Sequence, residues 1–373
     1  MRLDLSDDQQ FFQETVRRFI ETETPLTTVR ELADEPDGFD RAWWRAAAEL
    51  GFTSFLIPEE LGGGSVSGVG PMDLAIVAEE LGRGVGPGPL LPTNVVAETI
   101  AASGSPDQQA GLAGVIAGDV VLAWCFQEPG GDWTAASVGL EAAEHDGGFR
   151  LDGVKTTVEA GAQADQLLVT ARVAGGLTQF LVPADTPGIT ISPLSSLDLV
   201  RRFAEVRFEG VQVGADAVVG EVGGAGDDIE RQRLMAMMLQ SAEMAGAMAR
   251  VFEFTVEWGF DRHSFGRPLA SYQALKHRYA DMKLWLEASH AVTDGAAEAL
   301  GARVDAVIAV SAAKAYVGDR AVDIIQDCVQ LHGGIGVTWE HDIHLYLRRA
   351  TVNRGLFGTP EDHREVLAEA VGL

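Results

Sequence analysis

The chain has 373 residues, too many for one simple core, which predicts two or three domains. Its hydrophobic content of 46% supports large buried cores. The formal net charge of −27 argues against binding to nucleic acid, whose phosphate backbone requires clustered Lys and Arg. No window approaches about 18 uninterrupted apolar residues, so membrane insertion is not expected.

The cysteines and the N-terminus bear on the compartment. Cys125 and Cys328 cannot form a disulfide framework, and their small number suits a reducing cytoplasm. The first residues, MRLDLSDDQQFF, lack a basic segment followed by an apolar one, so we expect no signal peptide. The sequence therefore predicts a cytoplasmic protein.

The first 118 residues read as helices joined by turns rich in glycine and proline. Ser6 and Gln9 have the spacing of a capping box, which predicts that the first helix begins there. Further helices are expected over 41–50 and 72–81, where Gly51 and Gly82 follow the apolar pattern. This region is predicted to be an N-terminal α-helical domain.

From 119 to 225 the apolar period changes from that of a helix to two. Short alternating or β-branched runs are separated by glycine, proline and aspartate, which is typical of a small antiparallel barrel or sandwich. The expected strands are 120–126, 149–151, 166–172, 179–182, 189–193 and 204–208.

Residues 226–373 are expected to be helical again. Leu275, Tyr279, Met282 and Leu286 step by three and four, which predicts one buried stripe. The segment 304–328 is apolar on more than one side, which indicates the central helix of a bundle. The predicted domains are thus 1–118, 119–225 and 226–373, an α+β multidomain fold.

A series of short motifs follows the same order as the hallmarks of acyl-CoA dehydrogenases, and the chain resembles that family over essentially its whole length. The resemblance implies a helical domain, a small antiparallel β-barrel and a C-terminal four-helix bundle. The motifs are LGF with IPEELGG over 50–63, EELGR over 79–83, QEPG over 127–130, LDGVK over 151–155, DRHSFGR over 261–267 followed by Gln273, and QLHGGIG over 330–336 followed by Gly358-Thr359.

The resemblance also implies a chemistry. Members of this family remove the α-proton of an acyl-CoA thioester with a carboxylate while FAD accepts the β-hydride. The implied partners are an acyl-CoA substrate, an electron-transfer flavoprotein and neighbouring homologous subunits in a dimer or tetramer. In such assemblies one subunit holds the flavin ring and its neighbour holds the pyrophosphate and adenosine.

The half of the site that serves a neighbour is kept in this sequence. A guanidinium fork suits a pyrophosphate, and paired glycines let a backbone approach a phosphate closely. The residues that the resemblance assigns to FAD are Arg262, Ser264, Phe265, Gln273, Gln330, Gly333 and Gly334.

The half that would hold the flavin ring is altered. Trp133 stands where the family has a small serine, and Gln127 stands where it has a threonine. By register, Thr157 and Glu159 take the places of an aromatic residue and a threonine near flavin N5. An anionic Glu159 there would disfavour reduced flavin, unless the register is shifted by a residue or two.

Phe357 precedes Gly358-Thr359, where the common form of the family has the glutamate base. The family's alternative position for the base falls near Ala236, which is not acidic. Glu243 lies two turns further on nearly the same helix face and is the candidate catalytic residue, with Glu230 weaker. No metal is expected, because the spacing of the histidines matches no ligand motif.

Three functions remain open from the sequence. The chain is a base-deficient partner in a heteromeric acyl-CoA dehydrogenase, or a self-sufficient homo-oligomeric enzyme with a relocated base such as Glu243. The third alternative is a flavin-free scaffold or CoA-ester-binding subunit that keeps only the fold.

Overall fold

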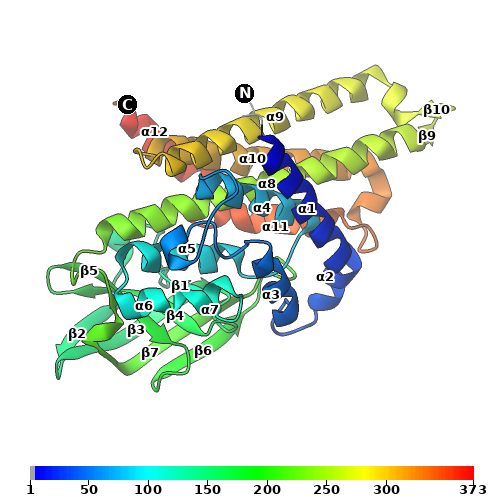
Figure 1. Ribbon diagram of the computed structural model, residues 1–373. Coiled ribbons are helices and arrows are strands. Elements are labelled where there is room, and N and C mark those ends of the chain that lie inside the picture. Colours follow the sequence, from blue (N-terminus) through cyan, green and yellow to red (C-terminus); the bar gives the residue numbers. More distant parts are fainter. Residues whose placement is uncertain (1–4) are drawn as a thin grey trace. The chain divides into compact units, whose positions relative to one another are not determined.

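A computed structural model describes residues 5–373, and the chain forms two compact units that are considered separately (Figure 1). The first unit contains the chain up to Val29, Pro71–Gly86 and Met237–Leu373. The second contains Arg30–Gly70 and Pro87–Ala236. The three-domain boundaries stay a prediction, since contacts group parts of the N-terminal region with the C-terminal helices.

Two helices of the second unit, α3 and α6, begin at residues whose side chains cap them. The Asp40 side chain accepts from the backbone N–H of Ala42 at 2.6 Å, and Ser105 with Gln108 forms a capping box. The helix expected over 41–50 is confirmed. The bounds are α3 (Arg41–Glu49), α5 (Leu90–Ser103), α6 (Pro106–Ala110) and α7 (Leu112–Ile116), and α2 (Leu26–Leu32) crosses the boundary between the units.

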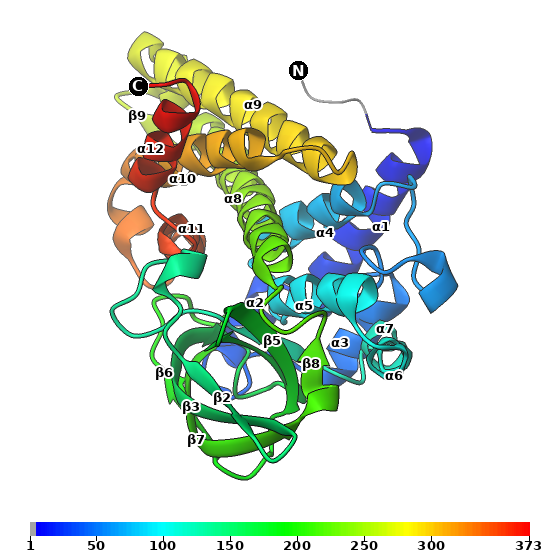
Figure 2. The ribbon, with the colours of Figure 1, turned by 90° about the vertical axis from the view of Figure 1, so that its left-hand side faces the viewer.

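The eight-stranded sheet of the second unit curls around an apolar interior (Figure 2). Leu151, Leu167, Phe180 and Val206 are fully buried members of that core. The order is β6-β7-β3-β2-β4-β5-β8, with β1 beside β4. The strands are β1 (Leu122–Cys125), β2 (Glu141–His145), β3 (Gly148–Glu159), β4 (Gln166–Val173), β5 (Gly176–Pro183), β6 (Ile189–Leu194), β7 (Phe203–Gly214) and β8 (Val218–Val219).

The sheet is largely antiparallel, as predicted, and contains two parallel pairings in addition. Strand β1 runs parallel to β4, and β2 meets β4 in a parallel pairing of Glu141 with Arg172. Strand β2 is not among the predicted strands, because its residues, EAAEH, lack β-branched side chains and only Ala142 is buried. Pairing with β3, rather than intrinsic preference, makes this segment a strand.

The first unit is helical. The predicted capping box at Ser6 and Gln9 is present, and the predicted central helix is α10, which contacts α9, α11 and α12 (Figure 2). The elements are α1 (Asp7–Glu23), α4 (Gly70–Gly84), α8 (Gly226–Asp261), the hairpin β9 (His263–Ser264) and β10 (Arg267–Pro268), α9 (Gln273–Gly301), α10 (Val307–His332), the 3₁₀ helix η5 (Gly333–Val337), α11 (Ile343–Gly355) and α12 (Pro360–Ala370). The first residues of α8, up to Ala236, belong to the second unit.

Helices α4 and α8 approach each other through two glycines. A Cβ added to Gly82 would lie 1.9 Å from the carbonyl oxygen of Glu243, and one added to Gly246 would lie 1.8 Å from that of Glu79. No larger residue fits at either position without moving a backbone. Among the described helices, none combines the length and apolar composition needed to cross a membrane.

Candidate functional site

The seven residues assigned to FAD all lie in the first unit, on a surface formed by the β9–β10 hairpin, the start of α9 and the end of α10. We call it the hairpin–glycine surface. Ser264 is half-buried and the others are exposed; they are Arg262, Phe265, Gln273, Gln330, Gly333 and Gly334. Figure 1 shows the hairpin where α8 and α9 meet.

The hairpin is pinned to the helices on both sides. The Arg262 N–H donates to the Trp258 carbonyl at 2.8 Å, which continues the last turn of α8. The Tyr272 hydroxyl donates to the Ser264 carbonyl at 2.7 Å. At the tip, Phe265 has φ 49° and is almost wholly exposed, so its ring contributes little to packing within this chain.

A stacked histidine joins the ends of α8 and α10 beneath this surface. The His332 ring stacks on Trp258 with centroids 5.3 Å apart and lies edge-on to His341 at 4.6 Å. Burial lowers the pKa of His332, and its Nδ1–H donates to the Cys328 carbonyl at 2.9 Å. This contact fixes the helix end that carries Gln330 and Gly333.

The residues of this surface fit the ADP side of FAD. An added Cβ would meet nothing within 4 Å at Gly333 or Gly334, and Gly333 has φ 65°. Arg262 is exposed and lies over the Trp258 ring at 5.8 Å. The surface therefore offers an exposed cation and an open backbone to an anionic ligand.

In the second unit, the QEPG and LDGVK motifs meet as a structural pair. Both carboxylate oxygens of Glu128 accept backbone N–H groups, from Gly139 and Leu140, at 2.9 Å. The fully buried Lys155 ammonium donates to Glu128 at 2.6 Å and to the Phe126 carbonyl at 3.0 Å. Burial lowers the pKa of Lys155, and Glu128 opposes that shift. This pair ties the loop that contains Glu128 to strand β3.

The positions expected near flavin N5 lie on a bulge of β3. The pairing of β3 with β7 shifts between Lys155 and Val158, and Thr157 has φ 53°. The carboxylate of Glu159 pairs with Arg201 at 3.1 Å, and both side chains are nine-tenths buried. Glu159 therefore already has a cationic partner within its own chain. We call residues 127–134 and 155–159 the loop–bulge region.

Phe357 is buried in the turn between α11 and α12. It has φ 60°, the next residue, Gly358, has φ 103°, and the Phe357 carbonyl accepts from Nε2 of His363 at 3.1 Å. Two successive left-handed residues are unusual, and one of them is not glycine. A phenyl ring there cannot accept a proton.

Glu243 is enclosed by donors from α11. Arg349 donates to one carboxylate oxygen at 2.6 Å and Asn353 to the other at 2.6 Å. Arg349 also donates to the Gly86 carbonyl at 3.2 Å. All three side chains are buried, and Ala236, the family's alternative position, is fully buried as well. The catalytic role of Glu243 stays a prediction.

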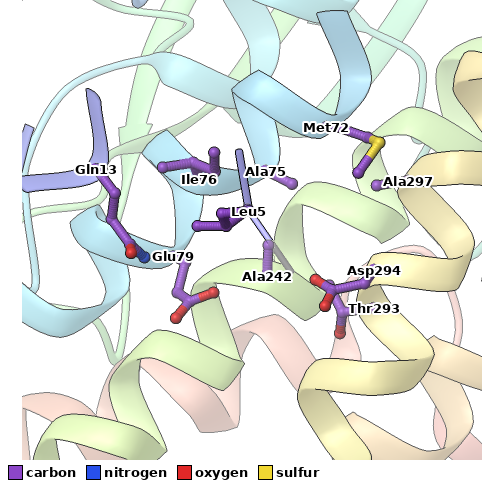
Figure 3. A pocket seen from close by; sticks show the side chains of 10 residues that line it. All are labelled: Leu5, Gln13, Met72, Ala75, Ile76, Glu79, Ala242, Thr293, Asp294 and Ala297. Atoms are coloured by element: carbon purple, nitrogen blue, oxygen red, sulfur yellow. The ribbon is translucent and has the colours of Figure 1, made fainter. Parts of the chain in front are cut away.

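A separate cavity of the first unit is too small for a substrate. Figure 3 shows it between α1, α4, α8 and α9, with the carboxylates of Glu79 and Asp294 at its wall. Its volume is about 20 Å³, room for about one water. His290 lies 3.5 Å from Glu79, and no group of three metal-ligating side chains occurs within residues 5–373.

Sequence reasoning missed the residues that support these sites. All but Asn353 are charged or aromatic, and nothing in their local sequence shows which residues they support. They are Trp258 and His332 under the hairpin–glycine surface, Arg201 beside Glu159, and Lys314, Arg349 and Asn353 around Glu243.

Helical regions before and after a curved sheet, with motifs for a flavin nucleotide, are the layout of a flavin-dependent oxidoreductase. The family models of acyl-CoA dehydrogenases match in three parts, the N-terminal domain over residues 6–119, the middle domain over 123–211 and the C-terminal domain over 228–372. The chain therefore belongs to the acyl-CoA dehydrogenase family, whose cofactor is FAD.

Individual relatives agree. Acyl-CoA dehydrogenase IpdE2 of Mycobacterium tuberculosis is 31% identical over 363 residues, which cover 97% of this chain and 95% of the relative. The ChsE4–ChsE5 complex from Mycobacterium tuberculosis matches with TM-score 0.88 and 27% identity over all of both chains. Butyryl-CoA dehydrogenase from Megasphaera elsdenii shares the fold, with TM-score 0.91 and 24% identity over all of both chains.

Proposed function

We propose that this chain is the base-deficient partner in a heteromeric acyl-CoA dehydrogenase, and that it contributes the ADP side of a FAD site shared with a homologous subunit. The observation that carries the proposal is the contrast between an open hairpin–glycine surface and a loop–bulge region whose charges are satisfied internally. The similarity to the ChsE4–ChsE5 complex, which contains two kinds of subunit by its name, supports it.

Within that assembly this chain's residues bind and orient rather than react. Arg262 would neutralise the pyrophosphate, Ser264 and Gln273 would donate or accept hydrogen bonds, and Gly333 with Gly334 would let the backbone approach the phosphates. FAD, when bound, supplies the hydride acceptor. Acyl-CoA would be oxidised with a base from the partner, and an electron-transfer flavoprotein would receive the electrons in the cytoplasm.

The second candidate is a self-sufficient enzyme in which Glu243 is the base. A general base must take up a proton, whereas the buried guanidinium of Arg349, which donates to Glu243, favours the charged carboxylate over the protonated acid. A Glu243→Gln variant separates the roles, with Glu243→Asp as its control. If Glu243 is the base, Glu243→Gln abolishes flavin reduction by acyl-CoA; if it is structural, stability falls and reduction continues.

The decisive experiment compares the chain purified alone with the chain purified beside a genomically adjacent homologue. We expect a colourless or weakly yellow chain alone, and a yellow complex with one FAD for each pair of unlike chains. One FAD per chain in the isolated protein, bleached by an acyl-CoA, would establish the self-sufficient enzyme instead. Absence of FAD with any partner would favour the flavin-free scaffold.

A further inference from the structure

The turn that carries Phe357 keeps a demanding backbone shape. Phe357 and Gly358 both have positive φ, 60° and 103°, and Phe357 is buried. A left-handed conformation costs a residue with a Cβ about 1–2 kcal/mol, and such residues persist where the surrounding structure holds them. The contacts that hold this turn are therefore informative about what it does.

The downstream end of the turn is held by His363 of α12. Its Nε2 lies 3.1 Å from the Phe357 carbonyl, and its Nδ1 lies 3.3 Å from the Ser311 hydroxyl of α10. A carbonyl only accepts, so Nε2 carries a proton, and in the neutral ring the Ser311 hydroxyl donates to Nδ1. His363 thus connects the backbone of Phe357 to α10 through a buried side chain.

The upstream end is held from the same helix. The fully buried Lys314 ammonium donates to the Asn353 carbonyl and to the Gln240 side-chain oxygen, the latter at 2.7 Å. The Asn353 side chain donates in turn to Glu243, which pairs with Arg349. Asn353 is therefore fixed through both its backbone and its side chain.

Ser311 and Lys314 are three residues apart, so they lie on one face of α10. From that face they hold both ends of the segment between Asn353 and Phe357. We propose that Ser311, Lys314 and His363 are positioning residues that keep position 357 in a fixed left-handed geometry. The catalytic meaning of position 357 rests on the proposed function, whereas the tethers rest on these contacts alone.

If this is right, the division of labour between subunits lies in the side chain at position 357. The backbone of the turn is still held in its left-handed conformation. Glu243 then acts through Asn353, as part of the same support. Its carboxylate orients the end of α11 instead of touching a substrate.

The test uses the purified complex and two different substitutions of the same residue, His363. His363→Gln keeps a donor for the Phe357 carbonyl and an acceptor for Ser311, whereas His363→Leu keeps the size and loses both. His277→Leu, at an exposed position on α9, is the control. The readouts are amide hydrogen exchange of residues 354–359, the ¹⁹F line of 4-fluorophenylalanine placed at position 357, and FAD content.

We expect exchange at 354–359 to accelerate roughly tenfold or more in His363→Leu, with a shifted or broadened ¹⁹F line and unchanged FAD content. His363→Gln and His277→Leu should match the parent. Equal exchange in His363→Leu and the parent would overturn the proposal, as would equal losses in the Leu and Gln variants. If His363→Leu loses FAD and also loses exchange protection across the whole chain, the effect is global and the proposal is overturned. FAD stoichiometry in the parent complex tests the proposed function separately.

Discussion

On the hairpin–glycine surface, Arg262 is exposed above an aromatic ring and Gly334 has open space where a side chain would stand. In the loop–bulge region, Lys155 is wholly buried against Glu128, and Glu159 is paired with Arg201. Both regions carry motifs of the same family. The difference teaches that a recognisable motif can serve the fold or a ligand, and that only unsatisfied groups distinguish the two.

The largest expected effect comes from removing an internal ion pair of the loop–bulge region. Lys155→Met leaves the largely buried carboxylate of Glu128 without its cation but with its two backbone N–H donors, which should lower the free energy of unfolding by about 3 kcal/mol. Urea denaturation of the purified chain measures this loss. Lys276→Met, at an exposed position on α9, should change it by less than about 0.5 kcal/mol. A loss no larger than that of the control would show that the loop–bulge region is not internally stabilised.

A substitution on the hairpin–glycine surface should weaken FAD binding and leave the stability of the chain unchanged. Arg262→Ala removes a charge-assisted contact to the pyrophosphate, which should weaken FAD binding by about 1.5–3 kcal/mol, or roughly 10–150-fold. Unfolding of the chain should be unchanged, because Arg262 is exposed. Fluorescence titration of the complex with FAD measures the affinity, with Lys283→Ala, further along α9, as control. Unaltered affinity would remove Arg262 from the cofactor site.

A single methyl group sharpens the comparison further. Gly334→Ala places a Cβ in open space without a positive φ, so stability should stay within about 0.5 kcal/mol of the parent. If a phosphate approaches the backbone there, FAD affinity should fall about tenfold. Gly295→Ala on α9, where an added Cβ also meets nothing, should leave affinity unchanged. Identical affinities for both variants would place the cofactor elsewhere.

The smallest expected effect concerns pH. Burial lowers the pKa of His332, so its contribution to stability is present above the usual histidine pKa of about 6.5 and is lost as pH falls through the lowered value. Acidification from about pH 7.5 to about pH 5.5 should therefore lower Tm more in the parent than in His332→Phe, which keeps a ring on Trp258. Equal shifts in the two proteins would show that His332 does not titrate in this range.

Local signals predicted the architecture well. The capping box at Ser6, the helix from Arg41 and the central position of α10 follow from spacing and period alone. Strand β2 could not be predicted, because its residues have no strand preference and depend on β3 for pairing. The parallel pairing of β1 with β4 is likewise a property of the folded sheet.

The site shows where sequence reasoning ends. Glu243 is the carboxylate that the sequence singled out, but its partners Arg349 and Asn353 lie more than a hundred residues away along the chain. Arg349 and Asn353 are four residues apart, so they share one face of their helix. Their local sequence does not indicate which helix packs against that face. Glu159 and Arg201 are similarly joined only because β3 pairs with β7.

The two glycines at the crossing of α4 and α8 have a consequence for engineering this chain. Gly82 of α4 contacts the backbone at Glu243, and Gly246 of α8 contacts the backbone at Glu79. Each helix therefore supplies one of the two glycines that the close packing requires. A chimera that takes α8 from a relative must take α4 with it, unless the donor has glycine at both places. The two helices therefore need to be exchanged together, and Glu243 is exchanged with them.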